Sequence, residues 1–137
     1  MKRRADRGAV TVELVLLTPV LLGFLALMAV LGRIAEAHGQ VEGAARDASR
    51  AASLERTVTL AQASARAAAE ANLAGQHVTC RSLLVALDTS SWRPGGSVRA
   101  DVTCTADLSG LGLTGVPGSK TLTGSSVSPL EQYRGQS

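Results

Sequence analysis

The apolar run LVLLTPVLLGFLALMAVLG, from Leu14 to Gly32, decides how this chain is organised. Its 19 residues contain no charged side chain. At about 1.5 Å of rise per residue, a helix of this length covers close to the roughly 30 Å hydrocarbon core of a bilayer. Pro19 removes one backbone donor, but membrane helices tolerate proline when the freed carbonyl is satisfied locally. The run is therefore predicted to be a membrane-spanning helix.

The net charge of the chain lies before this run. The 137 residues include 14 lysines and arginines and 11 aspartates and glutamates, a net charge of +3. Residues 1–8 hold four of the basic residues and one acidic residue, so the remaining ten of each sign cancel. This asymmetry predicts a cytoplasmic N-terminus and an extracytoplasmic C-terminal region. With no later basic patch and only one Trp, one Tyr and one Phe, nucleic-acid binding is not expected.

A secretory signal peptide is an alternative interpretation of the same segment. Ala35-Glu36-Ala37 fits an A-x-A cleavage site. The apolar run is longer, however, than the usual 7 to 15 residues of a signal peptide. A retained membrane helix is the favoured interpretation.

The residues around the start of the run carry a family resemblance. Gly8 is followed by Ala9-Val10-Thr11-Val12-Glu13-Leu14, with Pro19 inside the apolar run and Gly32-Arg33 after it. This pattern resembles the TadE-like family, minor pseudopilins of the tight-adherence (Tad/Flp) type IV pilus system. The resemblance implies that a prepilin peptidase removes a basic leader between Gly8 and Ala9. Leu14 stands where many relatives have Phe.

Glu13 is the acidic residue at the entrance of the run. Burying its carboxylate would cost on the order of 3 kcal/mol if it reached the centre of a membrane helix. The resemblance implies that Glu13 offsets the new amino group of a neighbouring subunit during assembly. The alternative without function is an acidic residue at headgroup level, favoured by the helix dipole.

The middle of the chain favours helix. Residues 33–74 contain fifteen alanines, which have high helix propensity. Small side chains form a narrow stripe at alternating spacings of three and four: Ile34, Ala37, Val41, Ala44, Ala48 and Ala51. The stripe is predicted to pack either against like helices in a filament or against this protein's own sheet. A break is expected between Leu54 and Thr59, with Thr57 or Thr59 capping a second helix that runs to about Leu73 and is stopped by Gly75.

Beyond Gly75 the pattern changes to strands. Residues 77–88 and 97–108 are compatible with strands, and the turn signal WRPGG at residues 92–96 separates them. A third strand is predicted over residues 120–127. These strands should form a small antiparallel sheet.

Two cysteines, Cys80 and Cys104, lie in the two predicted strands. A hairpin turning near residue 92 places them almost opposite each other, on faces shared with Val78, Ser82, Leu84 and Ala86 and with Val98, Ala100 and Val102. A disulfide formed outside the cytoplasm is predicted, and two unrelated thiols are the alternative.

The expected fold class is α+β: a long N-terminal membrane helix continuing into an Ala-rich helical stalk, then a three-stranded antiparallel sheet with one disulfide. The predicted parts are a leader (residues 1–8), a transmembrane helix (9–32), an extracytoplasmic helical region (33–75) and a disulfide-linked β domain with a Gly/Ser-rich tail (76–137).

The functional hypothesis is a minor pseudopilin or pilus-assembly component, located in the cytoplasmic membrane and in contact with lipid, prepilin peptidase and other pilin subunits. The chain lacks recognisable catalytic motifs, so no enzymatic activity, small-molecule substrate, cofactor or metal is expected. His38 and His77 are interpreted as solvated or structural. The alternatives are an uncleaved single-pass protein displaying an adhesive or sensory domain, and a secreted protein.

Overall fold

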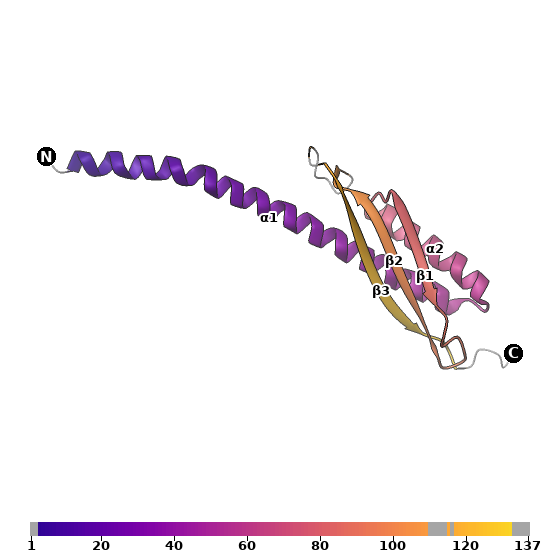
Figure 1. The fold of residues 1–137 in the computed structure, drawn as a ribbon. Helices are drawn as coiled ribbons and strands as arrows, with labels where there is room; N and C mark the ends of the chain where they lie inside the picture. The colour runs from indigo at the N-terminus through magenta and orange to yellow at the C-terminus, as the bar shows by residue number, and fades with distance from the viewer. Residues whose placement is uncertain (1–2, 110–114, 116, 133–137) are drawn as a thin grey trace. The chain divides into compact units, whose positions relative to one another are not determined.

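A computed structural model describes residues 3–109, 115 and 117–132, and gives only the backbone for residues 3–10. The element order is α1 (Arg3–Leu54), α2 (Val58–Gly75), β1 (Ser82–Asp88), β2 (Ser97–Asp107) and β3 (Ser119–Pro129) (Figure 1). The chain divides into two compact units, with the boundary between Arg33 and Ile34. The second unit contains the sheet, α2 and the C-terminal part of α1. The predicted α+β architecture is confirmed.

Helix α1 runs for 52 residues as one element and ends at Leu54, where the break was predicted. Thr57 caps the following helix: its backbone is extended (φ −125°, ψ 151°), and its hydroxyl accepts a hydrogen bond from Leu60 N at 3.3 Å. This bond satisfies one of the amide groups left free at a helix start. Thr57, rather than Thr59, is therefore the cap, and α2 ends at the predicted Gly75.

The sheet is antiparallel in the order β1-β2-β3. Helix α2 and the C-terminal part of α1 lie on the same face of this sheet (Figure 1). In β2 every even-numbered residue from Val98 to Ala106 is buried, as the alternation predicted. The core consists mainly of alanines and valines, with Leu73, Leu122 and Leu130 as its buried large aliphatic residues.

The small-residue stripe of α1 packs within this second unit. Ala37, Val41, Ala44 and Ala48 are at most 3% exposed, and Ile34 and Ala51 are half-buried. The stripe is thus covered within its own unit, which agrees with the predicted packing on this protein's own sheet. Its burial is wider than predicted, because Ala45, Ser49 and Ala52 are fully buried too.

Close contact between α1 and β3 occurs at Gly124. A Cβ at this position would lie 2.7 Å from Glu42 Cα, Glu42 N and Val41 O, all of them backbone atoms. Nearby, Ser49 Oγ and Ser128 Oγ are 2.9 Å apart and share a hydrogen bond. Helix α2 is tied to the sheet by Gln62 Nε2, which donates to Val85 O at 2.8 Å.

The predicted face and register of the first strand were wrong. Leu83 and Leu87 are half-buried and Val85 is buried, whereas Leu84 is 64% exposed. Both alternating sets of residues in SLLVALD contain apolar side chains, so alternation did not define one face. The bulkier set, with two leucines and a valine, occupies the core side.

The strand boundaries also differ from those predicted. Residues 77–81 precede β1, because the chain first closes the end of α2: Val78 N donates to Leu73 O at 3.0 Å, and His77 adopts φ 59°. The partner of Cys104 across the ladder is therefore Leu83, not Cys80. β3 is longer than predicted, at Ser119–Pro129.

Candidate functional site

The N-terminal part of α1 presents an uncovered apolar surface. Side chains from Thr11 to Ala29 are all exposed, including Leu14, Val15 and Leu16 at 65–67%. The helix has a mean hydropathy of 2.7 over its most apolar 18 residues. Among the residues that the structure describes, α1 is the one helix that is both long enough and apolar enough to cross a membrane. Water would solvate this surface poorly, whereas lipid or apolar helices would match it.

Pro19 lies inside this apolar surface, and its ring leaves the carbonyl of Val15 without the usual helical donor. One residue earlier, the Thr18 hydroxyl donates to the Leu14 carbonyl at 2.8 Å. Such i−4 bonds from Ser or Thr occur where helices bend. The pair supplies a local irregularity that a membrane helix can accommodate.

The predicted cleavage position, between Gly8 and Ala9, falls within the backbone of α1. Glycine is about 1 kcal/mol less favourable than alanine in a helix, and terminal turns fray. The position therefore lies where opening the helix to a peptidase costs little free energy.

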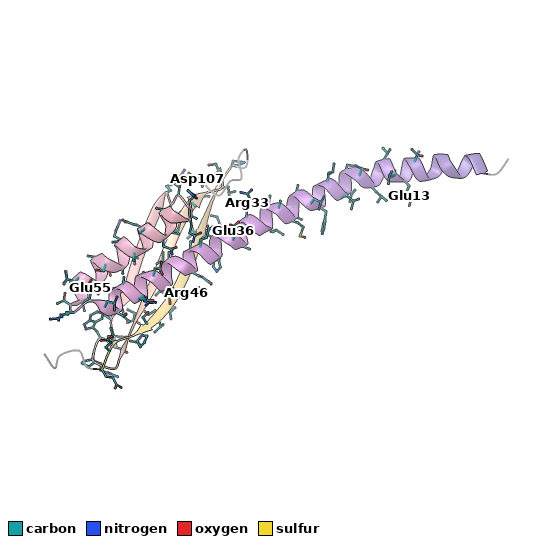
Figure 2. The ribbon with its side chains drawn as sticks, turned by 180° about the vertical axis from the view of Figure 1, so that it is seen from behind. Glu13, Arg33, Glu36, Arg46, Glu55 and Asp107 are labelled. Carbon is teal, nitrogen blue, oxygen red and sulfur yellow. A yellow bond between two sulfur atoms is a disulfide. The ribbon has the colours of Figure 1, made fainter. Side chains whose placement is uncertain are left out.

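Glu13 lies on the first turn of α1 whose side chains the structure describes, and it is exposed and projects from the helix (Figure 2). Among the side chains that the structure describes, no basic group pairs with it. Its negative charge is available to a cation from outside the described residues.

The predicted disulfide between Cys80 and Cys104 is confirmed, with Cα atoms 5.4 Å apart. Cys104 is buried in β2, while Cys80 lies half-buried before β1. Beside it, Arg81 N donates to Thr105 O, and the Arg81 guanidinium lies 2.9 Å from Asp107 Oδ1. These contacts fasten the segment after α2 to the central strand.

The sheet face away from the helices carries polar groups. Ser125 Oγ donates to Asp101 Oδ1 at 2.6 Å, and Arg99 Nε donates to the same oxygen at 3.1 Å. Chiefly the Ser125 hydrogen bond, and then Arg99, lower the pKa of Asp101 below its ordinary value of 3.8. On α1, the exposed His38 has Nε2 3.5 Å from Glu42 Oε1.

In chain order, the acidic Glu13 comes first, an exposed apolar segment of α1 follows it, and a small disulfide-linked unit comes last. Residues 8–50 match the family model described as TadE-like protein. The resemblance predicted from the N-terminal residues is thereby confirmed. No curated protein and no solved structure matches the chain. The match relates this chain to membrane proteins of the Tad pilus system, and the TadE-like region ends within α1.

Each predicted site residue except the two cysteines lies in the TadE-like region. The predicted cleavage site at Gly8 and Ala9 lies close to Glu13 on α1. Cleavage there would leave the new N-terminus at Ala9 about one helical turn from the Glu13 carboxylate. Cys80 and Cys104 lie beyond the region and belong to the second unit.

Proposed function

We propose that this chain is a minor pseudopilin or assembly component of a Tad/Flp-type pilus, processed by a prepilin peptidase after Gly8 and assembled through its N-terminal helix. The observation that carries the proposal is the coincidence of the TadE-like match with the exposed apolar surface. The match begins at Gly8 and includes Glu13 and the whole uncharged run.

Processing would change both the charge and the chemistry of the N-terminus. The leader holds four basic residues and one acidic residue, so its removal leaves side-chain charges that sum to zero. Cleavage also creates an ammonium group on Ala9. In a low-dielectric environment an ammonium and a carboxylate attract strongly, whereas each is costly alone. A neighbouring subunit's Glu13 is the proposed partner of this ammonium.

The disulfide supports an extracytoplasmic location for the second unit, because structural disulfides persist in oxidising compartments and are rare in the cytosol. The basic residues before the apolar segment of α1 support a cytoplasmic N-terminus. The two observations are independent and imply one orientation: residues 1–8 inside the cell, the apolar segment of α1 in the cytoplasmic membrane, and residues 33–137 outside.

The proposed role is structural. Its partners are membrane lipid, prepilin peptidase and the helices of other pilin subunits. It requires no enzymatic activity, cofactor, metal ion, nucleic acid or small-molecule substrate.

Two substitutions test the proposal in cells that assemble the pilus. Gly8→Val should retain the leader, since it places a branched side chain beside the cleaved bond, and the protein should run about eight residues larger on a gel. Gly23→Val is the matched control, because nothing lies within 4 Å of a Cβ there. Cleavage of the Gly8→Val protein at the normal position would contradict the assigned cleavage site.

Glu13→Ala should allow cleavage but reduce pilus assembly, while Glu13→Asp should retain part of it because the charge remains. The measurements are gel mobility for cleavage and the amount of pilin sheared from the cell surface. Normal piliation by the Glu13→Ala protein would refute the charge-neutralising role.

One observation supports the alternative of an uncleaved protein that displays a binding domain. The end of α2 and the start of β1 border an open groove of about 530 Å³, lined by Glu70, Leu73, Ala74, His77, Val78, Thr79, Cys80 and Leu83. Under this alternative, Gly8→Val would change neither the size of the protein nor pilus assembly.

A further inference from the structure

The two cysteines of the disulfide differ in their exposure to solvent. Cys104 is fully buried in β2, the central strand, and its partners across the two ladders are Leu83 and Leu122. Leu122 is only 2% exposed. Cys80 is half-buried and lies in the segment before β1, outside the ladder. A reagent arriving from solvent therefore meets different surroundings at the two ends of the same bond.

The backbone between α2 and β1 sets Cys80 beside the open groove. His77 adopts φ 59°, a left-handed conformation that is uncommon for residues other than glycine. Val78 N then donates to Leu73 O at 3.0 Å, which closes the end of α2, and Arg81 N donates to a carbonyl of β2. Between these two anchored points, Cys80 is one of the residues that line the groove of about 530 Å³.

Thiol–disulfide exchange begins when a thiolate attacks one sulfur of a disulfide, and access helps to decide which sulfur is attacked. Cys80 lines the groove and Cys104 does not. We propose that Cys80 is the sulfur at which this disulfide is attacked, and that the thiolate enters through the groove beside it. A new bond joins the thiolate sulfur to Cys80 Sγ while the Cys80–Cys104 bond breaks. The electron pair of the broken bond leaves with Cys104 Sγ, which then takes up a proton.

The reverse steps form the disulfide. The Cys80 thiolate attacks the disulfide of an oxidising partner, which releases one of its own sulfurs as a thiolate. Cys104 then displaces the partner's remaining sulfur from Cys80. In total, two electrons and two protons pass from the cysteines to the partner. Both directions use the same mixed disulfide on Cys80, and neither depends on leader removal after Gly8.

Trapping the mixed disulfide under native conditions tests the assignment of Cys80. The full-length protein in mild detergent is treated with glutathione, quenched in acid, alkylated with a maleimide in denaturant and digested for mass spectrometry. Glutathione on Cys80 with maleimide on Cys104 should exceed the opposite arrangement at least about tenfold. In guanidinium chloride, where burial no longer distinguishes the cysteines, the excess should fall to within about twofold. Comparable amounts of the two arrangements in the native protein, or an excess of glutathione on Cys104, would overturn the proposal.

Filling the groove tests the route of entry. Ala74 lines the groove and is exposed on α2, so Ala74→Phe should obstruct the groove and slow the native reaction with glutathione about fivefold or more. Ala67→Phe is the matched control, because Ala67 is exposed on the same helix and does not line the groove. Its rate should stay within about twofold of the parent. Equal rates for the two variants would overturn entry through the groove.

The attacking thiolate can belong to a low-molecular-weight thiol or to the cysteine of an oxidoreductase, and a second probe distinguishes these sources. Thioredoxin whose second active-site cysteine is replaced by serine is offered to the same protein in place of glutathione. A reductant-sensitive adduct with thioredoxin on Cys80 would assign the groove to protein thiolates as well, whereas reaction with glutathione alone would restrict it to small thiols. An adduct of either probe mainly on Cys104 would overturn the proposal.

Discussion

Gly124→Ala should destabilise the second unit although it adds only one methyl group. The new Cβ would lie 2.7 Å from three backbone atoms of Val41 and Glu42, so neither a rotamer change nor a flexible side chain can relieve the contact. Inserting a carbon into a packed core costs typically 1–3 kcal/mol. Replacing glycine also restricts the unfolded chain, which offsets about 0.4–1 kcal/mol.

The free energy of unfolding should therefore fall by about 1–2 kcal/mol. For a unit of roughly 100 residues, 1 kcal/mol changes Tm by about 4–8 °C. The melting temperature of the Gly124→Ala protein should thus be about 4–16 °C lower. The assay is thermal unfolding of the full chain in detergent, followed by the fluorescence of Trp92, the one tryptophan in the chain.

Gly39→Ala provides the matched control. Gly39 lies in α1, and nothing is within 4 Å of the position of its Cβ. The same substitution should raise stability here by about 0.5–1 kcal/mol, because alanine is the better helix former. If Gly124→Ala left Tm unchanged, or raised it as Gly39→Ala does, the close approach of β3 to α1 would be refuted.

Three further predictions concern the second unit. Reducing the disulfide, or replacing both cysteines by Cys80→Ser and Cys104→Ser, should lower the free energy of unfolding by about 3–4 kcal/mol, because a sequence separation of 24 closes a loop of about 25 residues. Equal melting temperatures with and without reductant would contradict this. Ser49→Ala should cost about 1 kcal/mol by leaving Ser128 without its partner, and a double-mutant cycle with Ser128→Ala should give a coupling near that value, whereas a coupling of zero would show that the hydroxyls act independently. Since folding lowers the pKa of Asp101, this carboxylate stabilises the folded state above its unfolded pKa, and the stabilisation is lost as the pH falls through the lower folded pKa. The Asp101→Asn protein should therefore lose less stability than the parent between about pH 5 and pH 2, measured by thermal melts at each pH. Parallel curves of melting temperature against pH would contradict the assignment.

The helices could be predicted from the sequence because their signals are local. Alanine content and the uncharged run specify helix, and the threonine at position 57 supplies a cap wherever the rest of the chain lies. The buried positions of β2 were likewise predictable, since its apolar residues alternate strictly with polar ones.

The register of β1 and the packing of α1 could not be predicted, because both depend on residues distant in sequence. SLLVALD offers apolar side chains to either face, and only the available core volume selects Leu83, Val85 and Leu87. Gly124 gave no helical or turn signal; its role becomes evident only where the α1 backbone approaches it.

The residues of the candidate site also differ in how far the sequence predicted them. The disulfide was predicted correctly although the assumed register was wrong, because Cys80 reaches Cys104 from the segment preceding β1 rather than from the ladder. The roles of Gly8, Ala9 and Glu13 were inferred from the resemblance to the TadE-like family, and they stay predictions.

Whether residues 1–8 form a removable leader is decided by the intact mass of the protein extracted from membranes of its native cells. We expect the mass of a chain that begins at Ala9, with the two hydrogens of the disulfide also absent. A full-length mass would contradict processing, and a chain beginning at His38 would instead show cleavage after Ala37 and secretion.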